Sequence, residues 1–167
     1  ARAAGSNAEI ARGCDRAVPA VFDTGQGEDA IEGPQGLLAA RPAHVPSRLP
    51  GGVVPPALAA ICVSTCDPDR IAALAARLPA QRLQFIESPV SGTSDQVARG
   101  DALGLVARDR AAIEGARGVI EAIAPRWHHL GAAGNGGRAK LAINLILGIN
   151  RAGLAEGLLF GERMGLS

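Results

Sequence analysis

The chain has 167 residues, and its 17 lysine and arginine residues are balanced by 16 aspartate and glutamate residues, which gives a formal net charge of +1. This balance lacks the basic excess by which proteins bind nucleic acid or an anionic membrane. Hydrophobic residues make up 47% of the sequence but aromatic residues only 2%. The core is therefore expected to consist of aliphatic side chains, and stacking platforms for single-stranded nucleic acid are missing.

Cysteine usage indicates a reducing compartment. The sequence contains Cys14, Cys62 and Cys66, an odd number without a regular framework, which favours a cytoplasmic protein. No second Cys/His pair at ligand spacing accompanies Cys62 and Cys66, and the adjacent His128 and His129 would point to opposite faces of a strand. We therefore expect no metal site.

The two ends of the sequence indicate a piece of a longer protein. The first residues, ARAAGSNAEI, contain no initiator Met and no apolar core of a signal peptide, and no apolar run reaches membrane-spanning length. We expect a partial chain without a membrane segment.

Residues 1–58 carry weak structural signals. The segment SNAEIARG (6–13) is compatible with a short helix capped by Ser6 or Asn7, and GEDAIEGPQGLLAA (27–40) with another. The stretch from 40 to 60 contains five prolines and no helical or strand period. We expect residues 1–58 to form an irregular, disturbed or poorly ordered N-terminal segment.

Residues 59–130 alternate between strand and helix patterns. Apolar runs predict strands within AAICVST (59–65), RLQFIES (82–88), DALGLVA (101–107) and RWHHLG (126–131). Helices are predicted after the N-caps Asp67 and Asp109, while PVSGTSDQ (89–96) is a loop or the start of a short helix that reaches about Arg99. This order is typical of an α/β unit with a parallel or mixed sheet.

A long helix is predicted from about Gly137 to about residue 164. Four glycines recur at four-residue spacing on one slowly drifting face, where another helix can approach closely: Gly153, Gly157, Gly161 and Gly165. Charged residues in the same helix argue against a membrane span: Arg151, Glu156, Glu162 and Arg163.

The glycine cluster GNGGRA (134–139) at the start of this helix matches the relaxed dinucleotide fingerprint G-x-G-x-x-A. The context argues against that interpretation, because no later strand follows to carry a ribose-binding acid and Glu156 falls inside the helical pattern. A P-loop would need Lys followed by Ser or Thr after its glycines, and this is lacking. A flexible joint between strand and helix remains an open alternative.

Lys140 and Asn144 follow the glycines and share one helix face among apolar neighbours. The spacing alone is more often typical of a lysine whose stem extends along an apolar surface beside an incidental asparagine. A functional pair is the second possibility.

Three stretches resemble the β-hydroxyacid dehydrogenases, the family of 3-hydroxyisobutyrate dehydrogenase. VSTCDP (63–68) is similar to the family's strand end, and ESPVSGTSDQVARGDAL (87–103) to its substrate loop D-A-P-V-S-G-G. GNGGRAKLAIN (134–144) is similar to G-x-G-x-x-x-K-x-x-x-N of its catalytic helix, and the order and spacing of all three agree. The resemblance covers about residues 59–167.

The sequence departs from the family pattern at several positions. Glu87 and Ser88 stand where Asp-Ala is commoner, Thr93 replaces a glycine, and Gln96 and Val97 replace Gly-Ala. Upstream of residue 59 only GPQGLLAA (33–40) is similar to the family, and the N-terminal glycine fingerprint is not found.

The resemblance implies a fold, a cofactor and a set of site residues. The fold is α/β: 59–130 is the second half of an incomplete Rossmann-like domain that binds NAD or NADP, and 131–167 begins an all-α domain. Lys140 is implied as the general acid/base and Asn144 as its catalytic partner. Substrate binding is implied for Ser91, Gly92 and Thr93, and cofactor binding for Thr65, Gly134 and Gly136.

The resemblance also sets expectations for the whole protein. The substrate is a small hydroxy acid, there is no nucleic-acid partner, and a homo-oligomer forms through the helical domain. The 167 residues alone are expected to be an inactive fragment because the fingerprint is missing. The alternative is a catalytically dead module that dimerises or binds other proteins through its long helix.

Overall fold

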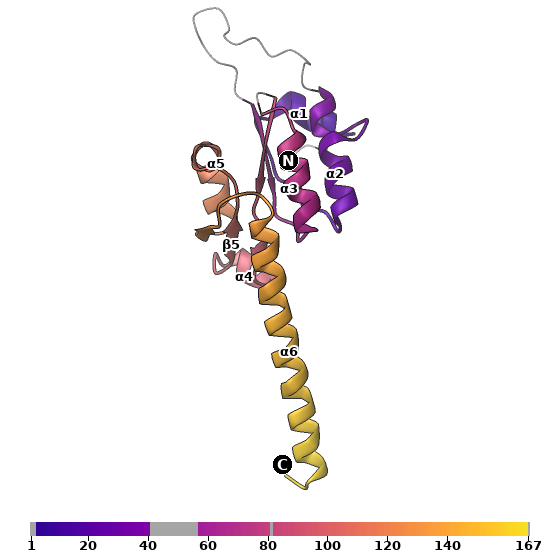
Figure 1. Ribbon diagram of the computed structural model, residues 1–167, viewed down its shortest axis with the longest axis vertical. Coiled ribbons are helices and arrows are strands. Elements are labelled where there is room, and N and C mark those ends of the chain that lie inside the picture. Colours follow the sequence, from indigo (N-terminus) through magenta and orange to yellow (C-terminus); the bar gives the residue numbers. More distant parts are fainter. Residues whose placement is uncertain (1–2, 41–56, 81, 167) are drawn as a thin grey trace, which may run out of the picture.

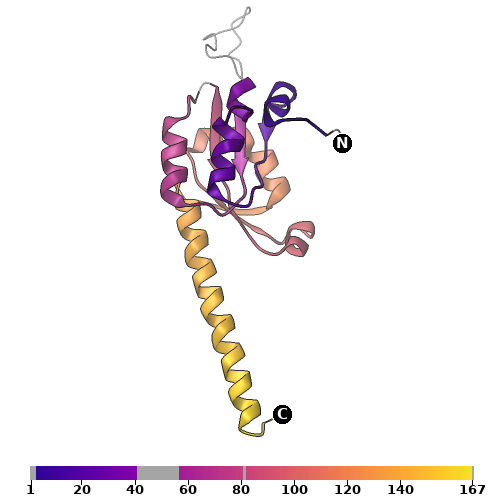
Figure 2. The same cartoon turned by 90° about the vertical axis from the view of Figure 1, so that its right-hand side faces the viewer.

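The computed structural model describes residues 3–40, 57–80 and 82–166. An α/β unit forms one end of the molecule, and the helix α6 (Asn135–Arg163) projects from it as a single rod (Figure 1). The view turned by 90° shows the same rod free of other elements over most of its length (Figure 2). The site is therefore to be sought where α6 meets the α/β unit.

The strands form a mixed arrangement of two three-stranded sheets. β1 (Arg16–Ala17), β2 (Leu58–Cys62) and β3 (Leu83–Glu87) are parallel in the order β1-β2-β3. β4 (Val90–Ser91) runs antiparallel to β5 (Leu103–Val106), which pairs in parallel with β6 (Arg126–His129). A single bridge between Glu87 and Ala107 joins the two sheets. The mixed α/β pattern predicted from the sequence is confirmed.

Helices cover both faces of the β1-β2-β3 sheet. One face carries α1 (Asn7–Gly13), α2 (Thr24–Glu32), the 3-10 turn η1 (Leu37–Ala40) and α3 (Pro68–Arg77), and the other carries α5 (Arg110–Ile123). A hydrophobic core lies on each face of the sheet, and alternate residues of β2 pack into one or the other. Leu58, Ala60 and Cys62 pack on the side of α3, while Ala59 and Ile61 pack on the side of α5. This alternation makes β2 a central strand buried on both sides.

The prediction of an irregular N-terminal segment is wrong for its described part. Residues 3–40 contain α1, β1, α2 and η1, and β1 pairs with β2. Ser6 caps α1 by accepting a hydrogen bond from the N–H of Glu9, as one of the two proposed caps. The strand was missed because two residues followed by Pro19 show no period. The proline-rich stretch 41–56 lies outside the described residues.

The predicted elements after residue 59 are confirmed. Asp67 and Asp109 cap α3 and α5 with their side chains, and a short helix α4 (Ser94–Ala98) follows the substrate-loop sequence. The ends of these elements differ from the predicted ones by a few residues, as helix and strand ends generally do.

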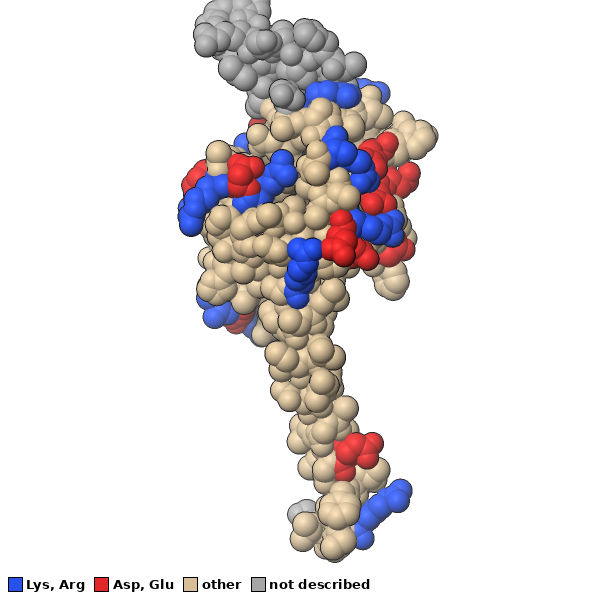
Figure 3. Space-filling view, in the orientation of Figure 1, with Lys and Arg blue, Asp and Glu red and all other residues tan. Residues whose placement is uncertain are grey.

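Helix α6 is apolar and exposed beyond its first turns. By length and composition alone it could cross a membrane, since an 18-residue window has a mean hydropathy of 1.3 and none of that window is buried. On the face shown in Figure 3, charged side chains gather on the α/β unit and again near the far end of α6. Charged residues inside the helix, Arg151 and Glu156 among them, argued against a span; the absence of a membrane partner stays a prediction.

Candidate functional site

The candidate site lies at the carboxyl ends of the parallel strands β2 and β3, where ligands bind in open α/β sheets. Thr65 is exposed in the loop that follows β2. Glu87 ends β3, and the first turn of α6 packs between the β2–α3 loop and β5. The structure thus brings three of the sequence motifs together at one edge.

The carboxylate of Glu87 binds the first turn of α6. Its Oε2 accepts hydrogen bonds from the N–H groups of Gly134 at 2.7 Å and Gly136 at 3.0 Å, and its Oε1 accepts one from Gly137 at 2.8 Å. The side chain is buried, with 3% of its surface exposed. Burial raises the pKa of Glu87, while the three N–H groups and the nearby Arg138 act against that rise.

The glycines are required by close packing. Gly134 has a φ of 96°, and a Cβ there would lie 2.7 Å from the carbonyl oxygen of Pro68. A Cβ on Gly136 would lie 2.6 Å from the carbonyl oxygen of Leu105. Both glycines are buried, and their N–H groups are bound to Glu87. The N–H groups of the cluster are therefore not available to a pyrophosphate, and both glycines have a packing role. The cofactor-binding role implied for Gly134 and Gly136 stays a prediction.

Lys140 is half-buried and Asn144 is exposed, both on α6 four residues apart. Burial lowers the pKa of Lys140 below that of an exposed lysine. Within the described ranges its ammonium forms no hydrogen bond or ion pair, so it is not committed to a structural partner. Lys140 is also the only lysine in the sequence, since the other 16 of the 17 basic residues are arginines.

The substrate-loop residues lie on and after β4. Ser91 is half-buried at the end of β4, and Gly92 is exposed with a φ of 152°, which side chains rarely adopt. Thr93 caps α4 by accepting a hydrogen bond from the N–H of Gln96 at 3.2 Å, while the Gln96 side chain accepts one from the N–H of Thr93 at 2.8 Å. Two departures from the family pattern therefore form one capping box.

The loop and the lysine helix leave the α/β unit at the same end but diverge from each other. Figure 1 shows both below the sheet, and Figure 2 shows α4 and α6 pointing apart. No described hydrogen bond joins Ser91 or Gly92 to Lys140 or Asn144. The structure does not test whether these four residues act on one substrate, and their implied roles stay a prediction.

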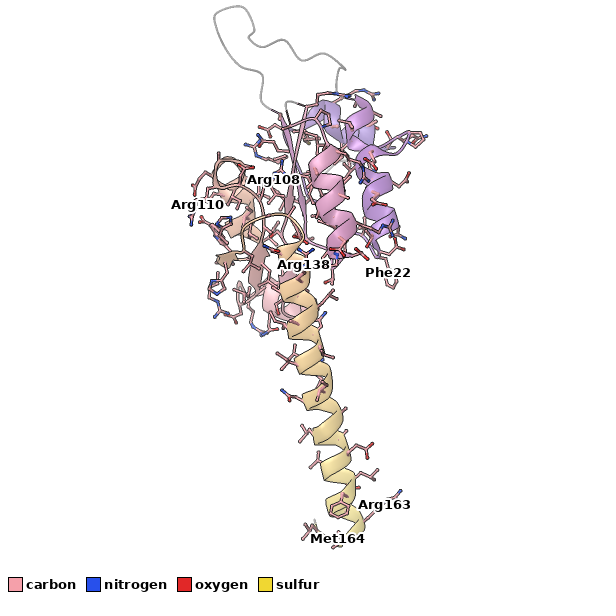
Figure 4. All side chains as sticks on the ribbon, viewed as in Figure 1. Phe22, Arg108, Arg110, Arg138, Arg163 and Met164 are labelled. Carbon is pink, nitrogen blue, oxygen red and sulfur yellow. The ribbon has the colours of Figure 1, made fainter. Side chains whose placement is uncertain are left out.

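The first turn of α6 is also fixed to α3. Arg138 forms an ion pair with Asp69 at 2.6 Å and donates a hydrogen bond to Asn135 at 3.1 Å. Figure 4 shows Arg138 at the upper end of α6, beside the lower end of α3. Because Arg138 and Asp69 are exposed, their pair contributes little on its own.

A pair of thiols lies beside Thr65. A hydrogen bond from Cys62 lowers the pKa of the Cys66 thiol to about 7, with burial acting against this fall and Thr24 adding to it. The same hydrogen bond and burial raise the pKa of Cys62. From the sequence, Cys62 and Cys66 were assessed only as metal ligands. The contact between the two thiols could not be inferred from their spacing, because they do not lie in one helix.

The role of Glu87 was not predicted from the sequence, where Glu87 stands out only as a departure from the family pattern. A usable signal existed: an acidic residue at the buried end of a strand needs a partner, and a glycine-rich helix start offers free N–H groups. The carboxyl ends of β2 and β3, beside the exposed Thr65, are where an open α/β sheet of this kind can accept a nicotinamide cofactor.

Comparison with known families gives one match over most of the chain. Residues 1–131 match the model of the NAD-binding domain of 6-phosphogluconate dehydrogenase. The match supports a nicotinamide dinucleotide, NAD or NADP, as the cofactor. It also includes residues 1–58, which were predicted to form an irregular segment before the Rossmann-like part.

Three similar proteins illustrate the range of relatives. The 2-(hydroxymethyl)glutarate dehydrogenase of Eubacterium barkeri is 28% identical over 166 residues, covering 99% of this chain and 51% of that protein. The structure of Mycobacterium tuberculosis 3-hydroxyisobutyrate dehydrogenase with L-serine superposes with a TM-score of 0.76 and 26% identity, over 98% of this chain and 50% of that chain. The cytokine-like nuclear factor N-PAC of Mus musculus is 28% identical over 167 residues, which are 100% of this chain and 28% of that protein.

Proposed function

The chain belongs to the family of the NAD-binding domain of 6-phosphogluconate dehydrogenase, and from this premise we propose that it serves hydride transfer between a hydroxy acid and nicotinamide. The chain spans about half the length of the two dehydrogenase relatives, 51% and 50%, and a smaller share, 28%, of the nuclear factor. The substrate class and activity are therefore proposed for the protein that contains it.

The observation that carries this proposal is the position of Lys140. A sequence that uses arginine for every other basic residue places its one lysine on the helix similar to the family's catalytic helix. A guanidinium does not release its proton near neutral pH, whereas a lysine ammonium does so once its pKa is lowered. Burial lowers the pKa of Lys140 in that direction.

The chemistry assigned to the residues follows from their groups. A bound nicotinamide supplies the hydride acceptor or donor. Lys140 takes the hydroxyl proton as the carbinol C–H bond breaks, and returns it in the reverse reaction. Asn144, one turn further along the helix, orients the hydroxyl or the ammonium. Ser91 and the N–H of Gly92 bind the carboxylate of the substrate, and Thr65 lies beside the nicotinamide.

Thr93 has two roles in this proposal. Its hydroxyl oxygen accepts the hydrogen bond that caps α4, and its O–H group remains to donate to the substrate carboxylate beside Ser91 and Gly92.

Kinetics of Lys140 variants test the proposal. In the protein that contains these residues, Lys140→Ala should lower the rate with a 3-hydroxy acid by ~10²–10⁴-fold, with little change in cofactor affinity. Lys140→Arg should be nearly as slow. Arg151→Ala, at an exposed position of the same helix, is the matched control and should turn over like the wild type. Unchanged turnover of Lys140→Ala with every 3-hydroxy acid tried would refute the proposal.

A second candidate function is a non-catalytic interaction module. It is favoured by the similarity of all 167 residues to a part, 28%, of a protein named as a nuclear factor, and by the exposed apolar side chains of α6. Fluorescence titration of the 167-residue chain with NADH and NADPH separates the two, because a module has no need to bind either. The same chain, assayed alone, is expected to show no dehydrogenase activity.

Self-association through α6 belongs to both candidates. Leu145 is 65% exposed, Ile149 62% and Leu158 62%, although such side chains are normally covered. We expect the chain to form homo-oligomers, and sedimentation at rising concentration measures this. A single monomeric species throughout would contradict it.

The described cysteines are free thiols, which supports the proposed cytoplasmic location.

A further inference from the structure

Helix α6 is capped differently from the other described α-helices. Each of α1 to α5 begins at a residue whose own side chain accepts a hydrogen bond from the first turn: Ser6, Asp23, Asp67, Thr93 and Asp109. The N-cap residue of α6 is Gly134, which has no side chain to do this. The acceptor is Glu87, 47 to 50 residues earlier in the chain. A local cap stabilises a helix wherever it lies, but a cap from a remote strand also fixes the helix in space.

The fit around Glu87 leaves little room for movement. Its two oxygens together accept three N–H groups at 2.7 to 3.0 Å. A Cβ on Gly136 or Gly137 would lie 3.0 Å from the carboxylate, so a side chain at either position would require the carboxylate to shift. Hydrogen bonds to an ionised acceptor are stronger than neutral ones, and the positive end of the helix dipole adds to them. The first turn is thereby held in one position relative to β3.

The rest of α6 has few other constraints. Beyond Lys140 nearly every residue is exposed, and the helix packs only through its first turns, against α3 and β5. Two further polar contacts are described near this point: the exposed ion pair of Arg138 with Asp69, and the hydrogen bond that the side-chain amide of Asn135 donates to the carbonyl oxygen of Leu130 at 2.8 Å. Lys140 follows Gly137 by three residues, which is less than one helical turn. The position of Lys140 therefore depends on the turn that Glu87 holds.

We propose that Glu87 is the positioning residue of the Lys140 site: its buried carboxylate holds Gly134, Gly136 and Gly137 and so fixes Lys140 at the carboxyl edge of β3. The catalytic consequence rests on the proposed function, but the positioning does not. Glu87 touches neither substrate nor proton in this account, and it acts only through the backbone of α6.

The test measures the titration of Lys140 in the 167-residue chain. Because the chain has one lysine, reductive methylation with ¹³C-formaldehyde gives one side-chain NMR signal, apart from that of the terminal amine. Glu87→Gln keeps the shape but replaces one acceptor oxygen by an amide that cannot accept. Asp109→Ala is the matched control, since it removes a carboxylate cap that accepts a hydrogen bond from Ala112 at 3.0 Å on another helix.

In Glu87→Gln the Lys140 pKa should rise towards the value of an exposed lysine, ~10.4. Amide exchange of residues 134–140 should become about tenfold faster or more, because charge-assisted hydrogen bonds are lost. Asp109→Ala should change neither quantity at α6. If Glu87→Gln does not fold, Glu87→Asp retains the charge on a shorter stem and should give a smaller shift in the same direction.

An unchanged Lys140 pKa and unchanged exchange in a folded Glu87 variant would overturn the proposal. Equal changes in Asp109→Ala would overturn it too, because they would report general loosening. A Lys140→Ala protein with full turnover would refute the proposed function but leave these two readouts intact. In an active protein, Glu87→Gln should lower kcat more than it raises KM.

Discussion

The close packing of Gly136 gives a prediction whose size follows from the coordinates. A Cβ added to Gly136 would meet the carbonyl oxygen of Leu105 at 2.6 Å and the carboxyl carbon of Glu87 at 3.0 Å. The Leu105 carbonyl is part of β5, which has β4 on one side and β6 on the other, so it cannot move away. The methyl group must push the first turn of α6 off the sheet or lengthen the hydrogen bond from Gly136 to Glu87.

We expect Gly136→Ala to destabilise the chain by ~1–3 kcal/mol, the usual cost of an added methyl group in a packed site. The matched control is Gly118→Ala in α5, where an added Cβ meets nothing within 4 Å. That change should instead stabilise by up to ~1 kcal/mol, since alanine favours the helix. Urea unfolding measures the free energy of unfolding of each variant, and the two values can be compared if the dependence of that free energy on urea concentration is the same. Gly136→Ala as stable as Gly118→Ala would refute the packing argument.

Two further predictions concern the loops beside the site. Thr93→Ala should remove one half of the capping box and destabilise α4 by ~1 kcal/mol. Hydrogen-exchange mass spectrometry should then show faster amide exchange in α4 but not in α5. Exchange in α4 as slow as in the unmodified protein would contradict this. In a Cys14→Ser background, the ultraviolet absorbance of the thiolate, which a buried group shows without contact with a reagent, should have a titration midpoint near pH 7, because the hydrogen bond from Cys62 lowers the pKa of the buried Cys66 to about 7. Because the pKa of Cys66 is lowered in the folded state, the stability that its thiolate contributes is fully present above the ordinary thiol pKa of ~8.5 and is lost as pH falls through about 7. A first thiolate midpoint near the ordinary value of ~8.5 would contradict the assigned hydrogen bond.

The fold after residue 59 could be predicted because local signals agree with the tertiary structure. Asp67 with Pro68 marks the start of α3, and Asp109 marks the start of α5. Residues 3–40 gave weaker signals, since β1 is two residues long and gains its stability from pairing with β2. Such pairing is non-local and leaves no period in the sequence.

The candidate site was predictable only in part for a similar reason. The spacing of Lys140 and Asn144 predicted a shared helix, and α6 confirms it. The partner of the glycine cluster could not be found from spacing, because Glu87 lies 47 residues before Gly134. Both glycines were assigned to the cofactor, a common use of glycine at a helix start, whereas in this chain their N–H groups bind a carboxylate.

The central claim is that the amine of Lys140 moves the substrate proton. Chemical rescue tests it most directly: Lys140→Ala protein is assayed with a 3-hydroxy acid, NAD⁺ or NADP⁺ and rising concentrations of small primary amines. The account predicts that the rate increases with amine concentration, and that guanidine gives no increase because it stays protonated. A rate that no amine restores, in a variant that still binds the cofactor, would contradict the claim.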